Sequence, residues 1–180
     1  MRPLHSQPLS SVPDRRSAPV EAPDFAGSVA STRCPKTAAA VWLAVRLVPL
    51  HMQMWRHLNA GVDPSAALSR IHGKDPGLHP RYEPHQLDEL RCAVHRAARL
   101  AALFGARNSC LTRSLVLSSL LYGRPNAFLN IGFRPAPGGA APPTGHAWVT
   151  LDAQNVSDMS IAQTEQQDFT VARRIPLAPT

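Results

Sequence analysis

Cysteine and aromatic residues are scarce in this 180-residue chain. Three cysteines, an odd number, cannot make the disulfide framework of a small secreted domain, and they favour a reducing cytoplasm. Aromatic residues make up only 6%, so aliphatic side chains must fill most of a core for which the 44% apolar residues suffice. Residues 1–16 contain no apolar signal-peptide segment.

Long apolar runs are also missing. The longest, residues 38–50, contains Arg46 and Pro49 and is shorter than the ~20 residues that a membrane-spanning helix needs. The eight histidines show no metal-ligand spacing. We therefore expect a cytoplasmic protein without a membrane span, a metal ion or another cofactor.

Lysine is almost absent, although the net charge is +7. Only Lys36 and Lys74 stand among the 19 basic residues, and arginine makes up the rest. Arginine suits bidentate contacts with carboxylates or phosphates. Such a surface fits an acidic peptide or nucleic acid, and it fits equally a solvated face without a special partner. We expect a peptide partner and no nucleic acid.

The chain changes character along its length. Residues 1–36 hold six of the 18 prolines without sustained periodicity, and we expect them to form a disordered tail. We expect one domain over 37–180, with a helical part (37–84) and a catalytic core (85–177).

Apolar periodicity predicts helices first and strands afterwards. This order indicates an α+β fold in which N-terminal helices pack on an antiparallel sheet. On the buried helix faces we expect, among others, Trp42, Val45, Leu47, Met54 and Phe104. The helices are expected over 37–59, 64–71, 84–104 and from 110 up to Gly123, and the strands over 128–133, 146–151, 156–161 and 169–175.

The stretch from Asn108 to Leu115 predicts a loop that delivers Cys110 onto the first turn of an apolar helix, capped by Asn108 or Ser109. A cysteine attacks as its thiolate, which a helix N-terminus favours. An amide N–H at a helix start also suits the oxyanion of a tetrahedral intermediate. The alternative is that Cys110 is a small buried residue of the helix.

A histidine opens the second predicted strand. Strand alternation places His146, Trp148 and Thr150 on one face, and leaves the opposite face, which carries Ala147, Val149 and Leu151, to the core. A histidine on the less apolar face suits a general base that must reach solvent and substrate. It is equally typical of a surface position.

An orienting carboxylate is less easily assigned. Asp152 lies on the strand of His146 at roughly 20 Å, given about 3.3 Å per residue, which is too far. A four-residue turn over 152–155 would place Asp158 on the wrong face. Its use therefore requires a three- or five-residue turn, or a bulge, near residues 152–156. Glu165 and Asp168 are remoter alternatives.

Three motifs follow one another along the chain: the run from Ser109 to Leu115, Asn130-Ile131-Gly132-Phe133, and Gly145-His146-Ala147-Trp148-Val149. Together they resemble the leader peptidases of lasso-peptide biosynthesis, which are transglutaminase-like cysteine peptidases. The resemblance covers residues 85–177, and more weakly the helices from residue 40. It implies a transglutaminase/papain-like core and a triad of Cys110, His146 and Asp158. We add Asn108, Arg113 and Trp148 as candidates for oxyanion or substrate binding.

The resemblance also implies a task and partners. The peptidase would remove the leader from a ribosomally made precursor peptide, so that an ATP-dependent cyclase can close the macrolactam. Residues 1–36 are too short and proline-rich for the family's leader-recognition domain, so we expect a separate leader-recognition protein. Two alternatives stay open: a non-catalytic scaffold that binds precursor or cyclase, and an acyl transferase that uses the same thiolate.

Overall fold

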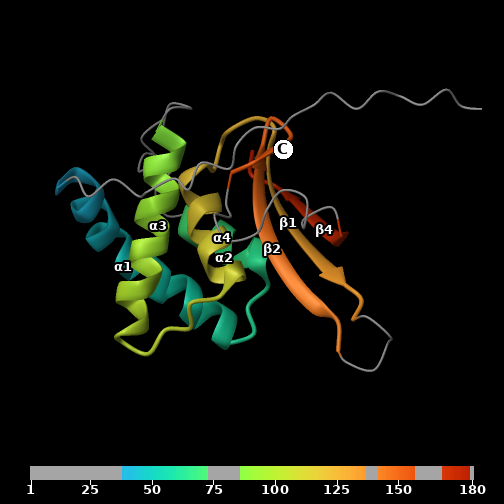
Figure 1. Ribbon diagram of the computed structural model, residues 1–180, viewed down its shortest axis with the longest axis horizontal. Helices are drawn as coiled ribbons and strands as arrows, with labels where there is room; N and C mark the ends of the chain where they lie inside the picture. The colour runs from blue at the N-terminus through green and yellow to red at the C-terminus, as the bar shows by residue number, and fades with distance from the viewer. Residues whose placement is uncertain (1–37, 73–85, 137–141, 157–167, 179–180) are drawn as a thin grey trace, which may run out of the picture. The chain divides into compact units, whose positions relative to one another are not determined.

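The computed structural model describes residues 38–72, 86–136, 142–156 and 168–178, all within one compact unit, Arg33–Thr180. In these ranges helices precede an antiparallel sheet, which confirms the expected α+β class (Figure 1). The elements are α1 (Ala38–Asn59), α2 (Pro64–His72), α3 (Leu87–Ala102), α4 (Cys110–Leu120), β1 (Ala127–Arg134), β2 (Thr144–Leu151), β3 (Gln154–Asn155) and β4 (Thr170–Pro176).

Local sequence signals set the helix boundaries. Gly61 and Gly105 adopt positive φ angles of 73° and 85°, a region that favours glycine, just after α1 and α3. Asp63 caps α2 by accepting the Ser65 amide at 2.9 Å, and Pro64 occupies the first helical position, where a missing N–H costs nothing. Gln86 stands in the N-cap position of α3, two residues beyond the predicted start.

The sheet has the strand order β3-β2-β1-β4. The register of β1 and β2 is continuous from Ala127 opposite Leu151 to Arg134 opposite Thr144. Between β1 and β4 the register shifts at Ile131/Gly132. These pairings place β1 and β2 inside the sheet and leave β3 and β4 at its edges.

The connection between β2 and β3 differs from expectation. Asp152 and Ala153 form a two-residue turn with positive φ angles of 49° and 65°, and Leu151 pairs directly with Gln154. Paired positive φ angles match the right-handed twist of a hairpin, which explains why this short turn replaces the expected four-residue one. The predicted strand 156–161 lies mostly outside the described residues.

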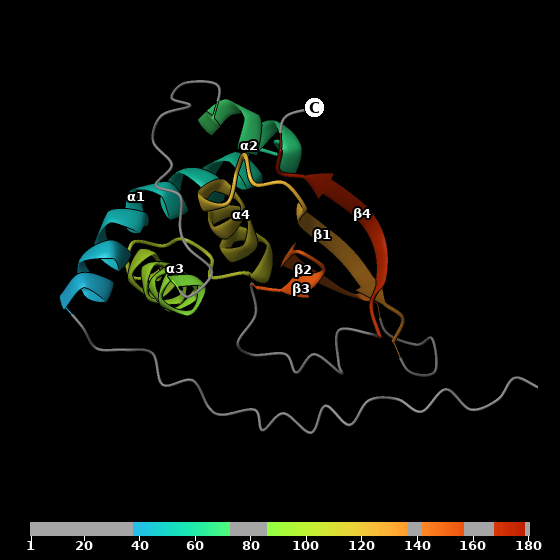
Figure 2. The same ribbon diagram turned by 90° about the horizontal axis from the view of Figure 1, so that it is seen from above.

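The core lies between the helices and one face of the sheet, with the helices on the same side (Figure 2). Helix α4 contacts both β1 and β2, while α1 and α3 pack against each other and against α4. Ala147 and Val149 are buried on the helix side and Leu151 packs on the core, as predicted. Other core residues include Leu47, Met54, Leu90, Leu115, Leu117, Leu129 and Ile175.

Three side chains predicted to be buried are exposed. Trp42 is 60% exposed and Val45 55%, on the face of α1 opposite the buried Ala44 and Leu47. Phe104 is 70% exposed because α3 ends at Ala102 and the chain turns away before it. The apolar side chains of α1 therefore extend around more of the helix than the face that the fold buries.

Candidate active site

The N-terminus of α4 is closed by a side-chain cap. Ser109 has extended backbone angles (φ −101°, ψ 156°), and its Oγ accepts the Thr112 amide at 3.1 Å. The Ser109 carbonyl also accepts the Arg113 amide at 3.1 Å. Of the two predicted caps, Ser109 is the correct one. Because the cap uses the amides of Thr112 and Arg113, the first-turn N–H groups that it leaves are those of Cys110 and Leu111.

Cys110 is the first residue of α4 and a half-buried, free cysteine. Its backbone N–H stands at the positive end of the helix, where partial charges favour an anion. The alternative of a fully buried helix residue does not fit this exposure. A free sulfur and a backbone N–H at the start of a helix therefore belong to one residue.

A second interaction crosses the start of α4. Arg113 donates from Nη1 to Oδ1 of Asn108 at 2.7 Å. The bond joins a residue two positions before Cys110 to one three positions after it. Asn108 and Arg113, two predicted site residues, are thus in contact on either side of Cys110 in the sequence.

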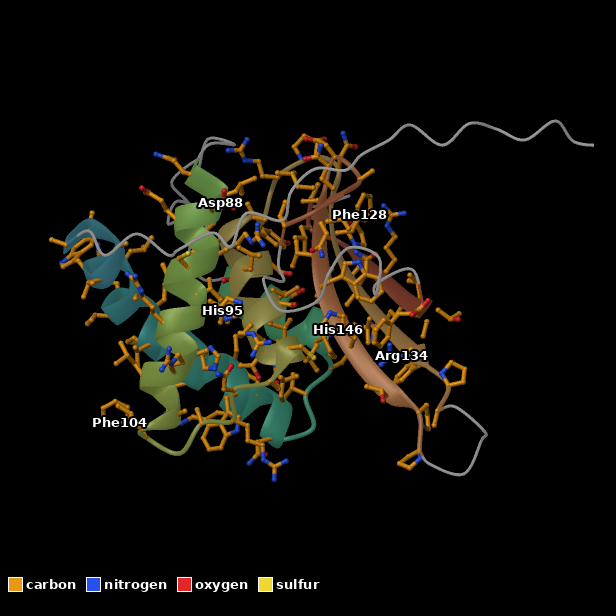
Figure 3. The ribbon with its side chains drawn as sticks, in the orientation of Figure 1. Asp88, His95, Phe104, Phe128, Arg134 and His146 are labelled. Atoms are coloured by element: carbon orange, nitrogen blue, oxygen red, sulfur yellow. The ribbon has the colours of Figure 1, made fainter. Side chains whose placement is uncertain are left out.

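His146 lies on β2 and is only 5% exposed. The expectation of a solvent-open or surface histidine is therefore wrong. Figure 3 shows it on β2, with Arg134 at the end of the neighbouring β1. Burial limits the orientations that this ring can adopt.

Aromatic rings surround that imidazole. Trp148 stacks on His146 with ring centroids 5.7 Å apart and an interplanar angle of 12°. Phe169, just before β4, lies 5.2 Å from the His146 ring and 6.4 Å from the Trp148 ring. Gly132 on β1 gives the Trp148 ring its space, since an added Cβ would lie 3.0 Å from that ring. Trp148 therefore packs against the histidine.

One buried hydrogen bond connects the cysteine helix to the histidine strand. The Ser114 hydroxyl donates to the Ala147 carbonyl at 2.8 Å. Ser114 lies one helical turn after Cys110, and Ala147 directly follows His146. The bond therefore joins the helix that begins at Cys110 to the strand that carries His146.

The third member of the predicted triad, Asp158, lies outside the described residues, as does Glu165. Its assignment required an odd turn or a bulge near residues 152–156, and the structure has neither there. The two-residue turn keeps the pairing regular, and the Val156 amide donates to the Val149 carbonyl at 2.9 Å. Asp168 forms an exposed ion pair with Arg134 at 3.9 Å. The proposal of Asp158 therefore rests on the family resemblance.

A buried histidine behind the site had no signal in the sequence. His51 on α1 is fully buried, close to the Arg107 backbone and to Arg113. Burial lowers the pKa of His51, the Arg107 carbonyl opposes this shift, and the positive charge of Arg113 adds to it. The neutral imidazole is thus favoured beneath the loop that leads to Cys110.

The sequence matches the transglutaminase-like superfamily over residues 55–174. The chain belongs to the transglutaminase-like superfamily. This superfamily includes cysteine peptidases, and the matched range contains Cys110 and His146. No match was found among curated proteins or solved structures.

Two further findings concern what this transglutaminase-like chain holds. In the described ranges, no group of three or more His, Cys, Asp and Glu side chains is placed to hold a metal ion. Over the same ranges, no helix is long and apolar enough to cross a membrane.

Proposed function

We propose that this protein is a cysteine peptidase that removes the leader from a ribosomally made lasso-peptide precursor before the macrolactam closes. The observation that carries the proposal is the Ser114–Ala147 hydrogen bond, which joins the helix of a free, half-buried Cys110 to the strand beside a buried His146. Membership of a superfamily that includes cysteine peptidases supports the same chemistry.

The proposed reaction begins with attack by the Cys110 thiolate on the scissile carbonyl carbon. The carbonyl oxygen becomes an oxyanion, which the Cys110 N–H and the Asn108 amide stabilise. His146 in its protonated form gives its proton to the leaving amine, and the C–N bond breaks. Water then attacks the thioester, and neutral His146 accepts a proton from it. The C–S bond breaks, which releases the leader with a new carboxyl group and regenerates the Cys110 thiolate. On the family resemblance alone, Asp158 is proposed to hold the histidine tautomer, because the regular two-residue turn after β2 does not support that assignment.

Substrate and partners follow from the resemblance. The substrate is the precursor peptide, presented by a separate leader-recognition protein in the cytoplasm. An ATP-dependent cyclase then uses the amine freed by cleavage. The basic net charge of +7 suits an acidic peptide partner. Trp148 packs on His146, so its place in the site is to support the imidazole.

The test is cleavage of a precursor peptide, with the leader-recognition protein supplied, by wild type and by Cys110→Ala. Mass spectrometry should show leader and core from the wild type and intact precursor from the variant. The control is Ser69→Ala, an exposed change on α2 that should cleave normally. Equal cleavage by wild type and Cys110→Ala would refute the mechanism. Binding without cleavage by both would favour the scaffold instead.

A further inference from the structure

The hydrogen bond from Arg113 to Asn108 has no role in the steps above, although it spans the start of α4. Its length of 2.7 Å is that of a strong N–H···O contact. The geometry points to Arg113 as a positioning residue that fixes the orientation of the Asn108 carboxamide for oxyanion binding. This inference rests on the proposed peptidase function, and it gives one residue of that site a distinct task.

The argument begins with donors and acceptors. An arginine side chain carries N–H donors and no acceptor, so it can bind only the oxygen end of an asparagine amide. With Oδ1 held by Arg113, the NH₂ end of Asn108 stays available as a donor. A carboxamide that rotated freely would also present its oxygen, which repels an oxyanion. Arg113 removes that unproductive orientation.

Arg113 is well placed for this task because its own backbone is part of the helix cap. Its amide donates to the Ser109 carbonyl at 3.1 Å. Ser109 is held in turn by contact of its Oγ with Thr112 Oγ1 at 2.7 Å. The arginine side chain therefore starts from a fixed point, one residue further along than the capped Thr112. The side-chain hydrogen bond between Arg113 and Asn108 then links residues on both sides of the cap residue Ser109.

A different role for Arg113 would be direct binding of a substrate carboxylate. The two roles predict different kinetics. A residue that binds the ground state changes KM, whereas one that orients an oxyanion donor changes kcat. They also differ in coupling, because a residue that acts through Asn108 has no effect once Asn108 is removed.

The decisive experiment is a double-mutant cycle on precursor cleavage. Asn108→Ala should lower kcat by about 100-fold, the loss typical of one oxyanion donor. Arg113→Ala should lower kcat by about tenfold with KM unchanged. In the Asn108→Ala background, Arg113→Ala should change kcat less than about twofold. Arg99→Ala, which removes an exposed positive charge on α3, is the matched control and should leave kcat unchanged.

Two further variants sharpen the result. Arg113→Lys should recover part of the lost kcat, since an ammonium also donates to Oδ1 but without the planar fork. Asn108→Asp keeps the pairing with Arg113 but replaces the donor by a negative charge, so it should be at least as slow as Asn108→Ala. Equal losses from Arg113→Ala in both backgrounds, or a loss confined to KM, would overturn the positioning role.

A second measurement does not depend on cleavage. Nitrogen-15 relaxation of the Asn108 side-chain amide should show a more mobile NH₂ group in Arg113→Ala than in the wild type. Unchanged relaxation would overturn the positioning role even in a protein that cuts. If the wild type cuts no precursor but the Asn108 amide is more mobile in Arg113→Ala, the peptidase function is refuted while the Arg113–Asn108 coupling is supported.

Discussion

Ser114 on α4 donates its hydroxyl hydrogen to the carbonyl of Ala147 on β2, at 2.8 Å and out of contact with solvent. Residues four apart lie on one face of a helix, so Cys110 lies about 6 Å along the helix axis from Ser114, towards the N-terminus. His146 is the neighbour of Ala147 along the strand. This single bond thus fixes where the helix of Cys110 lies along the strand of His146.

Ser114→Ala should therefore reduce stability and activity together. The Ala147 carbonyl would stay buried without this donor, at a cost of about 1–3 kcal/mol in the free energy of unfolding. Urea denaturation measures this change, and precursor cleavage should show a lower kcat. Ser69→Ala, whose hydroxyl bonds to Ser65 at an exposed site, should change the free energy by less than about 0.5 kcal/mol. Equal effects in both variants would mean that the hydrogen bond between α4 and β2 adds nothing to stability.

Gly132→Ala should disturb the packing around the histidine. The added Cβ would lie 2.7 Å from the Thr170 carbonyl and 3.0 Å from the Trp148 ring. Backbone at 2.7 Å cannot move without separating β1 from β4, so we expect a loss of about 1–3 kcal/mol, as for other overpacked sites. Thermal unfolding measures it. The matched change is Gly61→Ala, which meets no atom within 4 Å but strains a positive φ angle of 73°.

The sequence predicts local features such as helix ends, but not the aromatic contacts around His146. Ser109, Gly61 and Gly105 act within a few residues of themselves, so the helix ends could be predicted from the sequence. Phe169 packs on His146 from 23 residues further along the chain. No local pattern marks such a contact, because only the folded sheet creates it.

Burial could be predicted for a strand, which has only two faces, but not for a helix, whose covered face depends on the neighbouring elements. Alternation on β2 correctly assigned Ala147 and Val149 to the core, since a strand has two faces. On α1 the same reasoning failed for Trp42, because a helix offers several apolar stripes and the neighbouring elements decide which one is covered. The length of the turn after β2 was mispredicted for another reason. Asp152 and Ala153 both adopt positive φ angles although neither is glycine, so the sequence did not mark a two-residue turn there.

Acid should weaken the contact between Asp63 and Arg173, which joins the N-cap of α2 to β4. Hydrogen bonds from Arg173, and then from Ser65, hold the pKa of Asp63 well below its usual range. A carboxyl with a depressed folded-state pKa stabilises the fold above its unfolded pKa, about 3.9, and this contribution is lost as pH falls further. Asp63→Asn retains a good cap without the charge.

The measurement is the urea midpoint of both proteins from pH 6 down to pH 2. The wild type should lose its advantage over Asp63→Asn across the acid end of this range. The difference should be small because the pair is exposed, and high salt should shrink it. A pH-independent difference would contradict the ionic contribution and indicate an effect of shape alone.

His51 should make stability fall on mild acidification. Its folded-state pKa is lowered by burial, so the unfolded chain binds a proton more readily at this residue. The contribution is therefore complete above the unfolded pKa of about 6.5 and is lost as pH falls below it. His51→Phe cannot titrate and should remove this part of the slope between pH 7.5 and 5. Calorimetry of both proteins over that range tests it, and parallel curves would refute it.

The match to the transglutaminase-like superfamily starts at residue 55, in the second half of α1. Yet Ala44, Leu47, His51 and Met54 precede that point and are buried in the fold. Burying one large aliphatic side chain is worth about 1.5–3 kcal/mol, and a whole domain is stable by only about 5–15 kcal/mol. A chain shortened to residues 55–174 would lose Leu47 and Met54 from its interior. The matched range is thus smaller than the part of the chain that folds together, and a minimal folded unit has to begin at α1.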